Sequence, residues 1–244
     1  SLYHDVDMVN CVPTLLLQLG EKMGLQSDSL VGLREYVRNR PAVQKRIAHF
    51  YGVPLAKCKY AVLTVLNGGN MLGWAGGAGC TKNKERQLSD LTLLQEEGRQ
   101  IRDELLRKEA SRAKPLLDKK TEKRRSALAH ARATLDAART PQEKVAAEKA
   151  EEKARIRSTP SAVKRSVFST LVFDLEDKIL MAIDGYLRGA GWTVASFQFD
   201  GLLVKHRPDA TLQEAMRGAE AAVEEKTGYK IRLVEKELFG MDDE

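Results

Sequence analysis

An Asp-Gly dipeptide between two runs of strand-forming residues constrains this 244-residue chain more than any other feature. The dipeptide is Asp200-Gly201, and it lies between residues 196–199 and 202–204. Asp-Gly in this setting is the strongest short-range signal for a β-hairpin. We therefore predict a hairpin with Asp200 and Gly201 in its turn, which would present the Asp200 carboxylate at the tip.

A second carboxylate signal, Asp5-Val6-Asp7, lies in a short apolar run at the start of the sequence. We expect residues 2–8 to form a strand. If this strand lies beside the hairpin, carboxylates from both segments would meet. Mg²⁺ prefers carboxylate oxygens and is usually held by one or two of them together with substrate phosphates. The two signals therefore indicate phosphoryl or nucleotidyl transfer with divalent metal ions.

Composition and cysteine content describe a globular protein without a membrane segment. Hydrophobic residues make up 43% of the chain, and no apolar run approaches the roughly 20 residues that span a bilayer. The start carries no signal-peptide pattern. Three cysteines form no CxxC pair, and four histidines complete no zinc pattern. We expect an intracellular protein in a reducing compartment, with no membrane partner.

Periodicity and turn residues predict the elements outside the hairpin. The predicted helices cover residues 14–19, 28–51, 55–66, 167–187 and 211–226. Residues 67–79 are too rich in glycine for regular structure, and residues 229–234 alternate as an exposed or edge strand does. The order of these elements predicts an α+β fold with a small antiparallel sheet.

Positive charge is concentrated in one segment. Residues 82–158 hold 21 Lys and Arg against 14 Asp and Glu, a net charge of +7, whereas the whole chain carries +6. Charged residues and alanine dominate the segment, which is typical of long helices, with breaks expected near Pro115 and Pro141. The segment is either a solvated helical hairpin or partly disordered insertion, or a helical arm that follows a nucleic-acid backbone.

A lysine and an asparagine lie on similar sides of the helix predicted at residues 55–66. Lys59 precedes Asn67 by eight residues, which is a little over two helical turns. A cation and a polar side chain on one helix face could hold a triphosphate at one end and a sugar or base at the other.

In these segments the chain resembles the palm and fingers of family A, DNA polymerase I-like, nucleic-acid polymerases, and more distantly the single-subunit phage-type RNA polymerases. The run Asp5–Asn10 is similar to motif A, and Lys59–Gly68 is similar to the fingers helix of motif B. Phe199-Asp200-Gly201 is similar to the motif C hairpin. The helix before it, which contains Ser166 and Glu176, is similar to the helix that leads into motif C.

The resemblance implies template-directed nucleotidyl transfer to a primer 3′-hydroxyl, with two Mg²⁺ ions, or Mn²⁺, held by Asp5 and Asp200. The carbonyl of Val6 and the carboxylate of Asp7 would be further metal ligands. Lys59 would act in catalysis by neutralising charge on the triphosphate. The other nucleotide contacts that it implies are Asn10, Lys57, Asn67 and Gly68. The nucleic-acid contacts that we expect are Phe199, Lys45, Arg46, Lys119, Lys120, Arg124 and Arg125.

The chain departs from the family at several of these positions. Asn10 stands where the DNA enzymes carry the glutamate that selects the sugar, and Asn67 replaces a tyrosine. Gly201 replaces a carboxylate. Leu55 stands where the family has an arginine one turn before the lysine. Selection of deoxynucleotides or ribonucleotides, and of a DNA or RNA template, stays open.

The resemblance divides the chain into domains. The predicted divisions are a palm at residues 1–27 and 160–244, fingers-like helices at 28–81, and a charged helical insertion at 82–159. The expected partners are a nucleic-acid primer–template and nucleoside triphosphates. Further domains or subunits would supply a thumb, because the family has its thumb before motif A and this sequence has nothing there.

Two functions of other classes stay open. One is a catalytically inactive, palm-derived protein that binds nucleic acid through residues 82–158. The other is a nucleotide-sugar transferase in which Asp5-Val6-Asp7 is a metal-binding DxD. That enzyme class needs a run of parallel strands before the DxD, and four residues precede it here.

Overall fold

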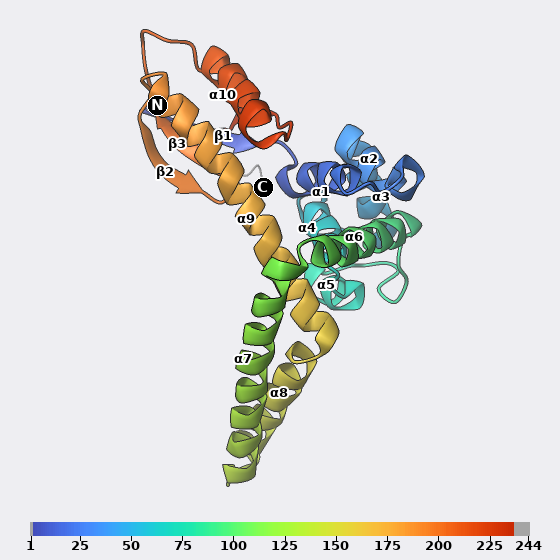
Figure 1. The fold of residues 1–244 in the computed structure, drawn as a ribbon. Coiled ribbons are helices and arrows are strands. Elements are labelled where there is room, and N and C mark those ends of the chain that lie inside the picture. The colour runs from blue at the N-terminus through green and yellow to red at the C-terminus, as the bar shows by residue number, and fades with distance from the viewer. Residues whose placement is uncertain (1, 237–244) are drawn as a thin grey trace.

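The structure, a computed structural model, describes residues 2–236 of the chain (Figure 1). Its strands are β1 (Tyr3–Met8), β2 (Val194–Gln198), β3 (Gly201–Lys205) and β4 (Leu233–Lys236). Its α-helices are α1 (Cys11–Lys22), α2 (Val31–Arg38), α3 (Arg40–Tyr51), α4 (Leu55–Leu66), α5 (Met71–Ala78), α6 (Ser89–Lys108), α7 (Ala110–Ala137), α8 (Pro141–Arg157), α9 (Pro160–Gly189) and α10 (Leu212–Thr227). A short 3₁₀-helix, η1 (Ser27–Ser29), precedes α2. The predicted α+β class is confirmed.

The described strands form one antiparallel sheet in the order β2-β3-β1-β4. Helices α9 and α10 cover one face of it (Figure 1). Val6 and Met8 of β1 point toward these helices and are buried in the core beneath them. Since successive side chains of a strand alternate between faces, Asp5 and Asp7 belong to the opposite face. The predicted edge strand is present as β4, although it begins at Leu233 rather than at residue 229.

The predicted hairpin is present, but its turn lies one residue earlier than Asp200-Gly201. Phe199 and Asp200 form the turn, and Gly201 is the first residue of β3, where it pairs with Gln198. Phe199 adopts a left-handed conformation with φ 48°, as tight hairpin turns require. Gly201 is needed for another reason, because a Cβ there would lie 2.5 Å from the carbonyl oxygen of Val6. The Asp200 carboxylate remains at the tip, as predicted.

The helix predicted over residues 28–51 is two helices, α2 and α3, separated at Asn39. Pro41 explains the break, because a proline inside a helix removes a hydrogen bond and its ring collides with the carbonyl four residues earlier. Here Pro41 lies in the first turn of α3, where it is tolerated. The predicted end at Gly52 is confirmed, and this residue has φ 63°.

The glycine-rich segment that was predicted to be irregular contains helix α5. Its first turn is capped by Asn70, whose side-chain oxygen accepts a hydrogen bond from the Leu72 N–H at 3.0 Å. Met71, Ala75 and Ala78 form one buried face against the helical core. The prediction was wrong because burial of this face outweighs the low helix propensity of glycine.

The insertion predicted at residues 82–159 begins later in the structure, because α6 belongs to the helical body. Leu91 and Ile101 of α6 are fully buried in the core that α1 to α5 share. The buried Glu97 accepts hydrogen bonds from the backbone N–H groups of Gly32 and Leu33 at the start of α2, each at 2.7 Å. Composition did not indicate this role, because the other faces of α6 are charged.

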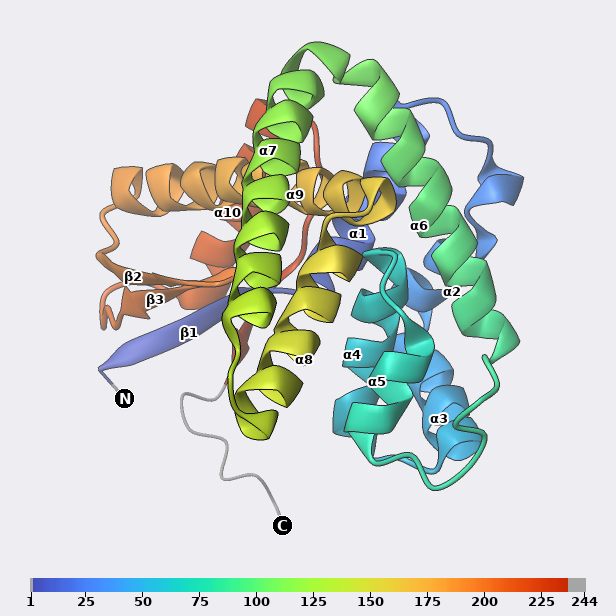
Figure 2. The same cartoon turned by 90° about the horizontal axis from the view of Figure 1, so that it is seen from below.

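The rest of the predicted insertion is a helical hairpin of α7 and α8 that extends from the body (Figures 1 and 2). The break expected near Pro115 lies instead at Glu109, and Pro115 lies inside the 28-residue helix α7. A proline there costs one backbone hydrogen bond without ending the helix. The break near Pro141 is confirmed. Arg132 of α7 and Glu151 of α8 form an ion pair at 3.3 Å across the hairpin. We call α7 and α8 together the arm.

Helix α9 runs through two hydrophobic cores and joins them. Its first half buries Val167 and Leu171 in the helical core formed with α1 to α6. Its second half buries Ile179 and Ile183 in the core between α9, α10 and the sheet. The buried stripe predicted over residues 167–187 is therefore confirmed, and it serves two cores rather than one.

Candidate active site

The pairing of β1 with β3 brings Asp7, rather than Asp5, next to the turn that holds Asp200. Asp7 lies directly opposite Gly201 in the register, whereas Asp5 lies opposite Leu203, two residues farther along β3. The two predicted carboxylate segments are therefore adjacent. The nearer residue of the first segment is Asp7.

Two backbone features hold the turn against β1. The N–H of Met8 donates a hydrogen bond to the carbonyl of Asp200 at 3.2 Å. The missing side chain of Gly201 permits a close approach, because a Cβ there would lie 3.0 Å from Oδ1 of Asp7. The glycine that replaces a carboxylate in the predicted motif C thus has a structural reason.

The Asp7 carboxyl group lies in surroundings that oppose its negative charge. It is 8% exposed, and burial raises its pKa above the usual 3.8. The charge of Asp200 and a hydrogen bond between the two carboxyl groups raise that pKa further. An ion pair with Lys236 of β4 acts in the opposite direction. One ammonium thus partly compensates two neighbouring acidic groups.

A third carboxyl group, that of Glu176, approaches the same place from α9. Burial raises the pKa of Glu176, and the charge of Asp200 adds to the effect. Cys11, the first residue of α1, donates a hydrogen bond from Sγ to Oε1 of Glu176 at 3.3 Å. Burial and the adjacent carboxylates raise the pKa of the Cys11 thiol, so it acts as a donor and not as a thiolate nucleophile. We call Asp7, Asp200 and Glu176 the carboxyl cluster.

Asn10, the predicted sugar-contact residue, lies between β1 and α1 in a left-handed conformation with φ 51°. Its side-chain oxygen accepts a hydrogen bond from Nη1 of Arg40 at 2.7 Å. Arg40 begins α3, and the sequence analysis missed it because no local pattern connects it with Asn10. The contact places a guanidinium group at the end of the strand that carries Asp7.

The residues predicted to hold the triphosphate lie on or beside α4, in the helical body. Lys59 is exposed, and its ammonium lies 5.0 Å from the ring centroid of Tyr60. Lys57 donates a hydrogen bond to the carbonyl of Ala78 at 2.8 Å, which connects α4 with α5. Asn67 donates to a carbonyl within its own helix at 3.0 Å. Across residues 2–236 no hydrogen bond or ion pair joins these side chains to the carboxyl cluster, so their role stays a prediction.

Gly68, also a predicted nucleotide contact, lies against two arginines. A Cβ on Gly68 would lie 2.7 Å from Nη1 of Arg102 and 2.8 Å from Cδ of Arg165. Arg102 comes from α6 and is 9% exposed, and Arg165 comes from the first half of α9. The end of α4 therefore faces two guanidinium groups from elements that are distant in the sequence.

The predicted nucleic-acid contacts outside the arm have different surroundings. Phe199 is 100% exposed at the tip of the hairpin. Lys45 is exposed on α3. Arg46 forms an ion pair with Asp90 at 2.6 Å, so part of its charge is already compensated.

The four predicted arm contacts fall into two groups. Lys120 and Arg124 line a groove where α7 meets α8 and α9. Lys119 and Arg125 are exposed on α7, outside that groove.

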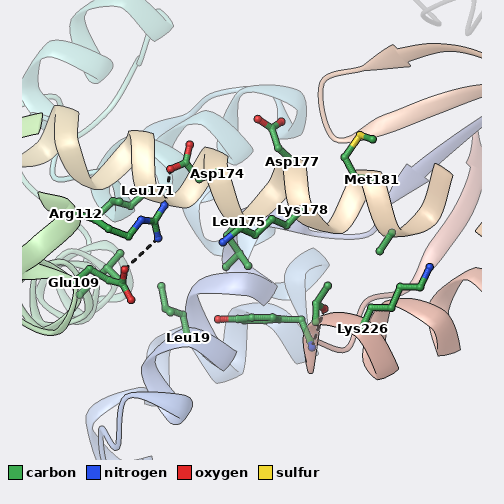
Figure 3. Close-up of a pocket in the computed structure, with 14 residues that line it drawn as sticks. Leu19, Glu109, Arg112, Leu171, Asp174, Leu175, Asp177, Lys178, Met181 and Lys226 are labelled. Atoms are coloured by element: carbon green, nitrogen blue, oxygen red, sulfur yellow. Dashed lines mark hydrogen bonds and ion pairs between the residues drawn. The ribbon is translucent and has the colours of Figure 1, made fainter. Parts of the chain in front are cut away.

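A cavity of about 750 Å³ lies on another side of α9 (Figure 3). Arg112, one of its lining residues, pairs with Asp174 at 2.9 Å and with Glu109 at 3.1 Å. Lys178 also lines it, and at 3.6 residues per turn its side chain lies about 160° around α9 from that of Glu176. The cavity contains none of the predicted site residues and is separate from the carboxyl cluster.

Asp7 and Asp200 are the residues of the carboxyl cluster that could hold a divalent metal ion together with substrate. In the part of the chain that the structure describes, no group of three or more His, Cys, Asp or Glu side chains is arranged to hold an ion alone. Mg²⁺ usually takes one or two carboxylates together with substrate phosphates, and Asp7 and Asp200 supply that number. Their repulsion is relieved by a cation. Binding would require the ammonium of Lys236 to leave Asp7.

No helix among residues 2–236 is both long and apolar enough to cross a membrane. Cys11, Cys58 and Cys80 are buried free cysteines.

Comparison with known proteins gives no family. No protein-family model matches the chain, and a search of curated proteins finds no relative. The case for a function therefore rests on the geometry of the site.

Proposed function

We propose that the chain is a template-directed nucleotidyltransferase of the DNA polymerase type, which adds nucleotides to a primer 3′-hydroxyl with two divalent metal ions. One observation carries this proposal: the fold brings Asp7 and Asp200 together from opposite ends of the sequence. Both lie on strand–turn backbone that the pairing of β1 with β3 fixes.

Asp7 and Asp200 would hold the metal ions in this proposal. When bound, Mg²⁺ would lower the pKa of the attacking hydroxyl and neutralise the triphosphate and leaving group. Asp7 takes the principal role that the sequence suggested for Asp5, because Asp7 lies opposite Gly201. Asp5 would be an outer ligand or bind through water, since it is two residues away on the same face.

The other residues of the chain would position substrate. Glu176, held by the Cys11 thiol, keeps a third acidic group beside Asp200. Arg40, anchored to Asn10, brings positive charge to the end of β1, where it could bind substrate phosphate. Lys59 would approach the triphosphate from the exposed side of α4.

The nucleotide-sugar transferase alternative receives no support from the fold. That class needs parallel strands before the DxD, whereas the strands of residues 2–236 pair antiparallel throughout. The inactive nucleic-acid-binding alternative requires an assay.

The direct test is extension of a labelled primer on DNA and RNA templates with Mg²⁺ and either dNTPs or NTPs. We expect Asp7→Asn and Asp200→Asn each to reduce the extension rate at least about 100-fold, because each removes charge that stabilises the transition state. Asp5→Asn should reduce the extension rate by less. Asp209→Asn, an exposed carboxylate paired with Arg207, is the control and should keep the parental rate. Parental extension by both cluster variants would show that the metal assignment is wrong.

A second readout separates an inactive binder from an enzyme. Mg²⁺ that binds the native state raises the melting temperature, by an amount that grows with the logarithm of its concentration relative to Kd. We expect a rise for the parent and none for Asp200→Asn. If the parent binds primer–template but neither extends it nor responds to Mg²⁺, the inactive binder is the correct description.

A further inference from the structure

A groove of about 680 Å³ lies where the arm joins α9, in the region seen from below in Figure 2. Its lining residues come from three helices and are mostly cations and alanines. They are Lys120, Lys123, Arg124, Ala127, Ala150, Lys153, Ala154, Arg157 and Ser166. The groove lies outside the carboxyl cluster.

The spacing of these residues explains why the groove exists. On α7 they occur at positions i, i+3, i+4 and i+7 from Lys120, and on α8 the same spacing starts at Ala150. This is the face that a helix turns toward its neighbour. A hairpin of two helices normally fills that face with large apolar side chains. Here the alanines leave space, and the cations border it.

The positive charge of the groove is not compensated by the protein. No carboxylate belongs to its lining, as far as the described chain shows. The ammonium of Lys120 donates hydrogen bonds to neutral acceptors, Oγ of Ser166 at 2.9 Å and Oγ1 of Thr170 at 2.7 Å. Arg124 donates to the carbonyl of Arg157. An anion would supply the missing charge.

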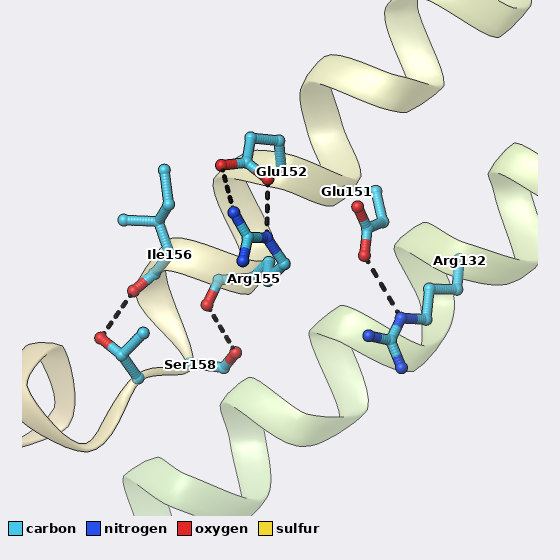
Figure 4. A network of polar contacts seen from close by, with 7 residues as sticks. Arg132, Glu151, Glu152, Arg155, Ile156 and Ser158 are labelled. Atoms are coloured by element: carbon cyan, nitrogen blue, oxygen red, sulfur yellow. Dashed lines mark hydrogen bonds and ion pairs between the residues drawn. The ribbon is translucent and has the colours of Figure 1, made fainter.

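Some cations elsewhere on the arm are paired with carboxylates, whereas others, such as Lys119 and Lys149, are exposed singly outside the groove. Arg132 pairs with Glu151, and Arg155 pairs with Glu152 at 2.7 Å (Figure 4). Lys123 and Lys153 form no ion pair with any residue in the range 2–236, and unlike Lys119 and Lys149 they border a groove that other cations share.

Burial and neighbouring positive charges both disfavour the charged forms of two groove cations. Burial lowers the pKa of Lys120, and the charges of Arg124 and Lys123 lower it further. Burial also lowers the pKa of Arg124, with Arg157 and Arg165 as additional causes. Each of these groups would be stabilised by an anion in the groove.

We propose that this groove binds consecutive phosphates of a single nucleic-acid strand. The inference rests on the proposed function. It specifies where a nucleic-acid strand would be bound at a distance from the carboxyl cluster. The groove residues from Lys120 to Ala127 span seven residue steps, about 10 Å of helix, which exceeds one phosphate. Ser166 in the groove precedes Glu176 by ten residues of α9, a distance of about 15 Å. At the spacing of a duplex strand, 3.4 Å per nucleotide, about four nucleotides would reach from the cluster to the groove.

The test measures binding of a fluorescently labelled single-stranded oligonucleotide by anisotropy over a series of salt concentrations, without divalent metal or nucleotide. The groove variant is Lys123→Ala with Lys153→Ala. The control is Lys119→Ala with Lys149→Ala, which removes the same charge from exposed positions of the same two helices outside the groove. Circular dichroism confirms that both variants fold.

We expect the groove variant to lose at least about tenfold in affinity at low salt. The slope of log K against log salt should fall by about 1.4, since each phosphate contact to a single strand contributes about 0.7. The control should change affinity by less than about threefold. Equal losses of affinity in the two variants would show that the effect comes from overall positive charge and not from the groove, and would overturn the proposal.

A competition experiment separates a strand from a free polyphosphate, which offers similar chemistry. Tripolyphosphate should displace the oligonucleotide from the parent only at much higher concentration than an unlabelled strand does. Displacement at equal phosphate concentration would show that the groove is a site for small polyphosphates, and the proposal would be wrong.

The binding assay and the extension assay test the two proposals separately. Asp200→Asn should bind the oligonucleotide with parental affinity, because the assay requires no metal at the carboxyl cluster. Loss of extension in that variant with intact groove binding supports both proposals. Parental binding by the groove variant overturns only the groove.

Discussion

At the scale of single residues, Gly201 decides whether β1 and β3 can lie as close as the carboxyl cluster requires. A Cβ at this position would lie 2.5 Å from the Val6 carbonyl oxygen and 3.0 Å from Oδ1 of Asp7. We expect Gly201→Ala to lower the free energy of unfolding by about 1–3 kcal/mol, because backbone must move to make room. Urea unfolding followed by circular dichroism measures the change.

Gly73→Ala is the matched control for this substitution. Gly73 lies in α5 with nothing within 4 Å of the position a Cβ would take. Alanine there should leave stability unchanged or raise it by up to about 1 kcal/mol, since alanine is the better helix former. Equal losses at Gly73 and Gly201 would contradict the close approach of the two strands.

Asp7 should make stability fall with rising pH, because burial outweighs its ion pair with Lys236. Its folded-state pKa is raised above 3.8 by burial and by Asp200, so between the two pKa values the native state holds a proton that the unfolded state has lost. Stability therefore falls as the pH rises from the unfolded to the folded pKa. Asp7→Asn removes this loss, and its stability relative to the parent should grow over that range.

Urea unfolding at several pH values in EDTA checks this prediction. Asp209→Asn is the control with the opposite sign, because Arg207 lowers the pKa of the Asp209 carboxyl. A stability difference between the parent and Asp7→Asn that is constant over the whole pH range would contradict the perturbed carboxyl. Added Mg²⁺ should reduce the gain from Asp7→Asn, since the ion stabilises the parent alone.

The candidate site was predictable at residue scale only where its signals are local. Asp200 and the strand with Asp7 were found because hairpins and short strands follow from adjacent residues. The choice between Asp5 and Asp7 was not, because it depends on the strand register, and a shift of two residues would place Asp5 opposite Gly201 instead. Lys236 and the role of Glu176 were missed, since both reach the cluster through packing of segments remote in the sequence.

At the scale of elements, α2 depends on α6 for its N-terminal cap. No side chain at the start of α2 caps it, and Glu97 of α6 accepts hydrogen bonds from the N–H groups of Gly32 and Leu33 at 2.7 Å. Glu97→Ala should lower the free energy of unfolding by about 2–3 kcal/mol, because it leaves buried donors unpaired. Glu97→Gln should cost less, as an acceptor oxygen remains.

The neighbouring Glu96 supplies the comparison for Glu97. It pairs with Arg99 on the exposed side of α6, and removing such a surface pair typically costs less than about 1 kcal/mol. Amide hydrogen exchange should show faster exchange at Gly32 and Leu33 in Glu97→Ala and no change in Glu96→Ala. Unaltered protection in both variants would contradict the cap.

Elements were predictable from the sequence where one face or one breaker dominates. The helix at residues 55–66 and the end at Gly52 are confirmed to the residue. The irregular structure expected at residues 67–79 was wrong, because tertiary burial of one face made a helix of a glycine-rich segment. The placement of α6 in the insertion was wrong, because buried Leu91 and Ile101 are few beside its charged residues.

At the scale of the whole molecule, the chain is two hydrophobic cores joined by helices rather than by a linker. Helix α9 buries residues in both cores, and so does α1, with Leu15 in the sheet core and Leu16 in the helical core. Sequence reasoning predicted the buried stripe of α9 but not its division, because periodicity shows which face is buried and not what covers it. The division matters because Glu176 of the carboxyl cluster lies on α9 between Val172 of the helical core and Ile179 of the sheet core.

The shared helices predict that both cores unfold in one transition, and each core contains one tryptophan that can report on it. Trp74 packs against Tyr51 in the helical core, with ring centroids 5.3 Å apart, and Trp192 is 5% exposed in the sheet core. In Trp74→Phe and Trp192→Phe the remaining tryptophan reports one core, while circular dichroism reports the whole chain. We expect coincident urea midpoints of fluorescence and circular dichroism within each variant, since α9 cannot lose one half without exposing the apolar surface of the other.

A fluorescence midpoint that separates from the circular dichroism midpoint in either variant would mean that the cores are independent. The carboxyl cluster would then depend on the docking of two bodies, and its geometry would vary with conditions that leave each core folded.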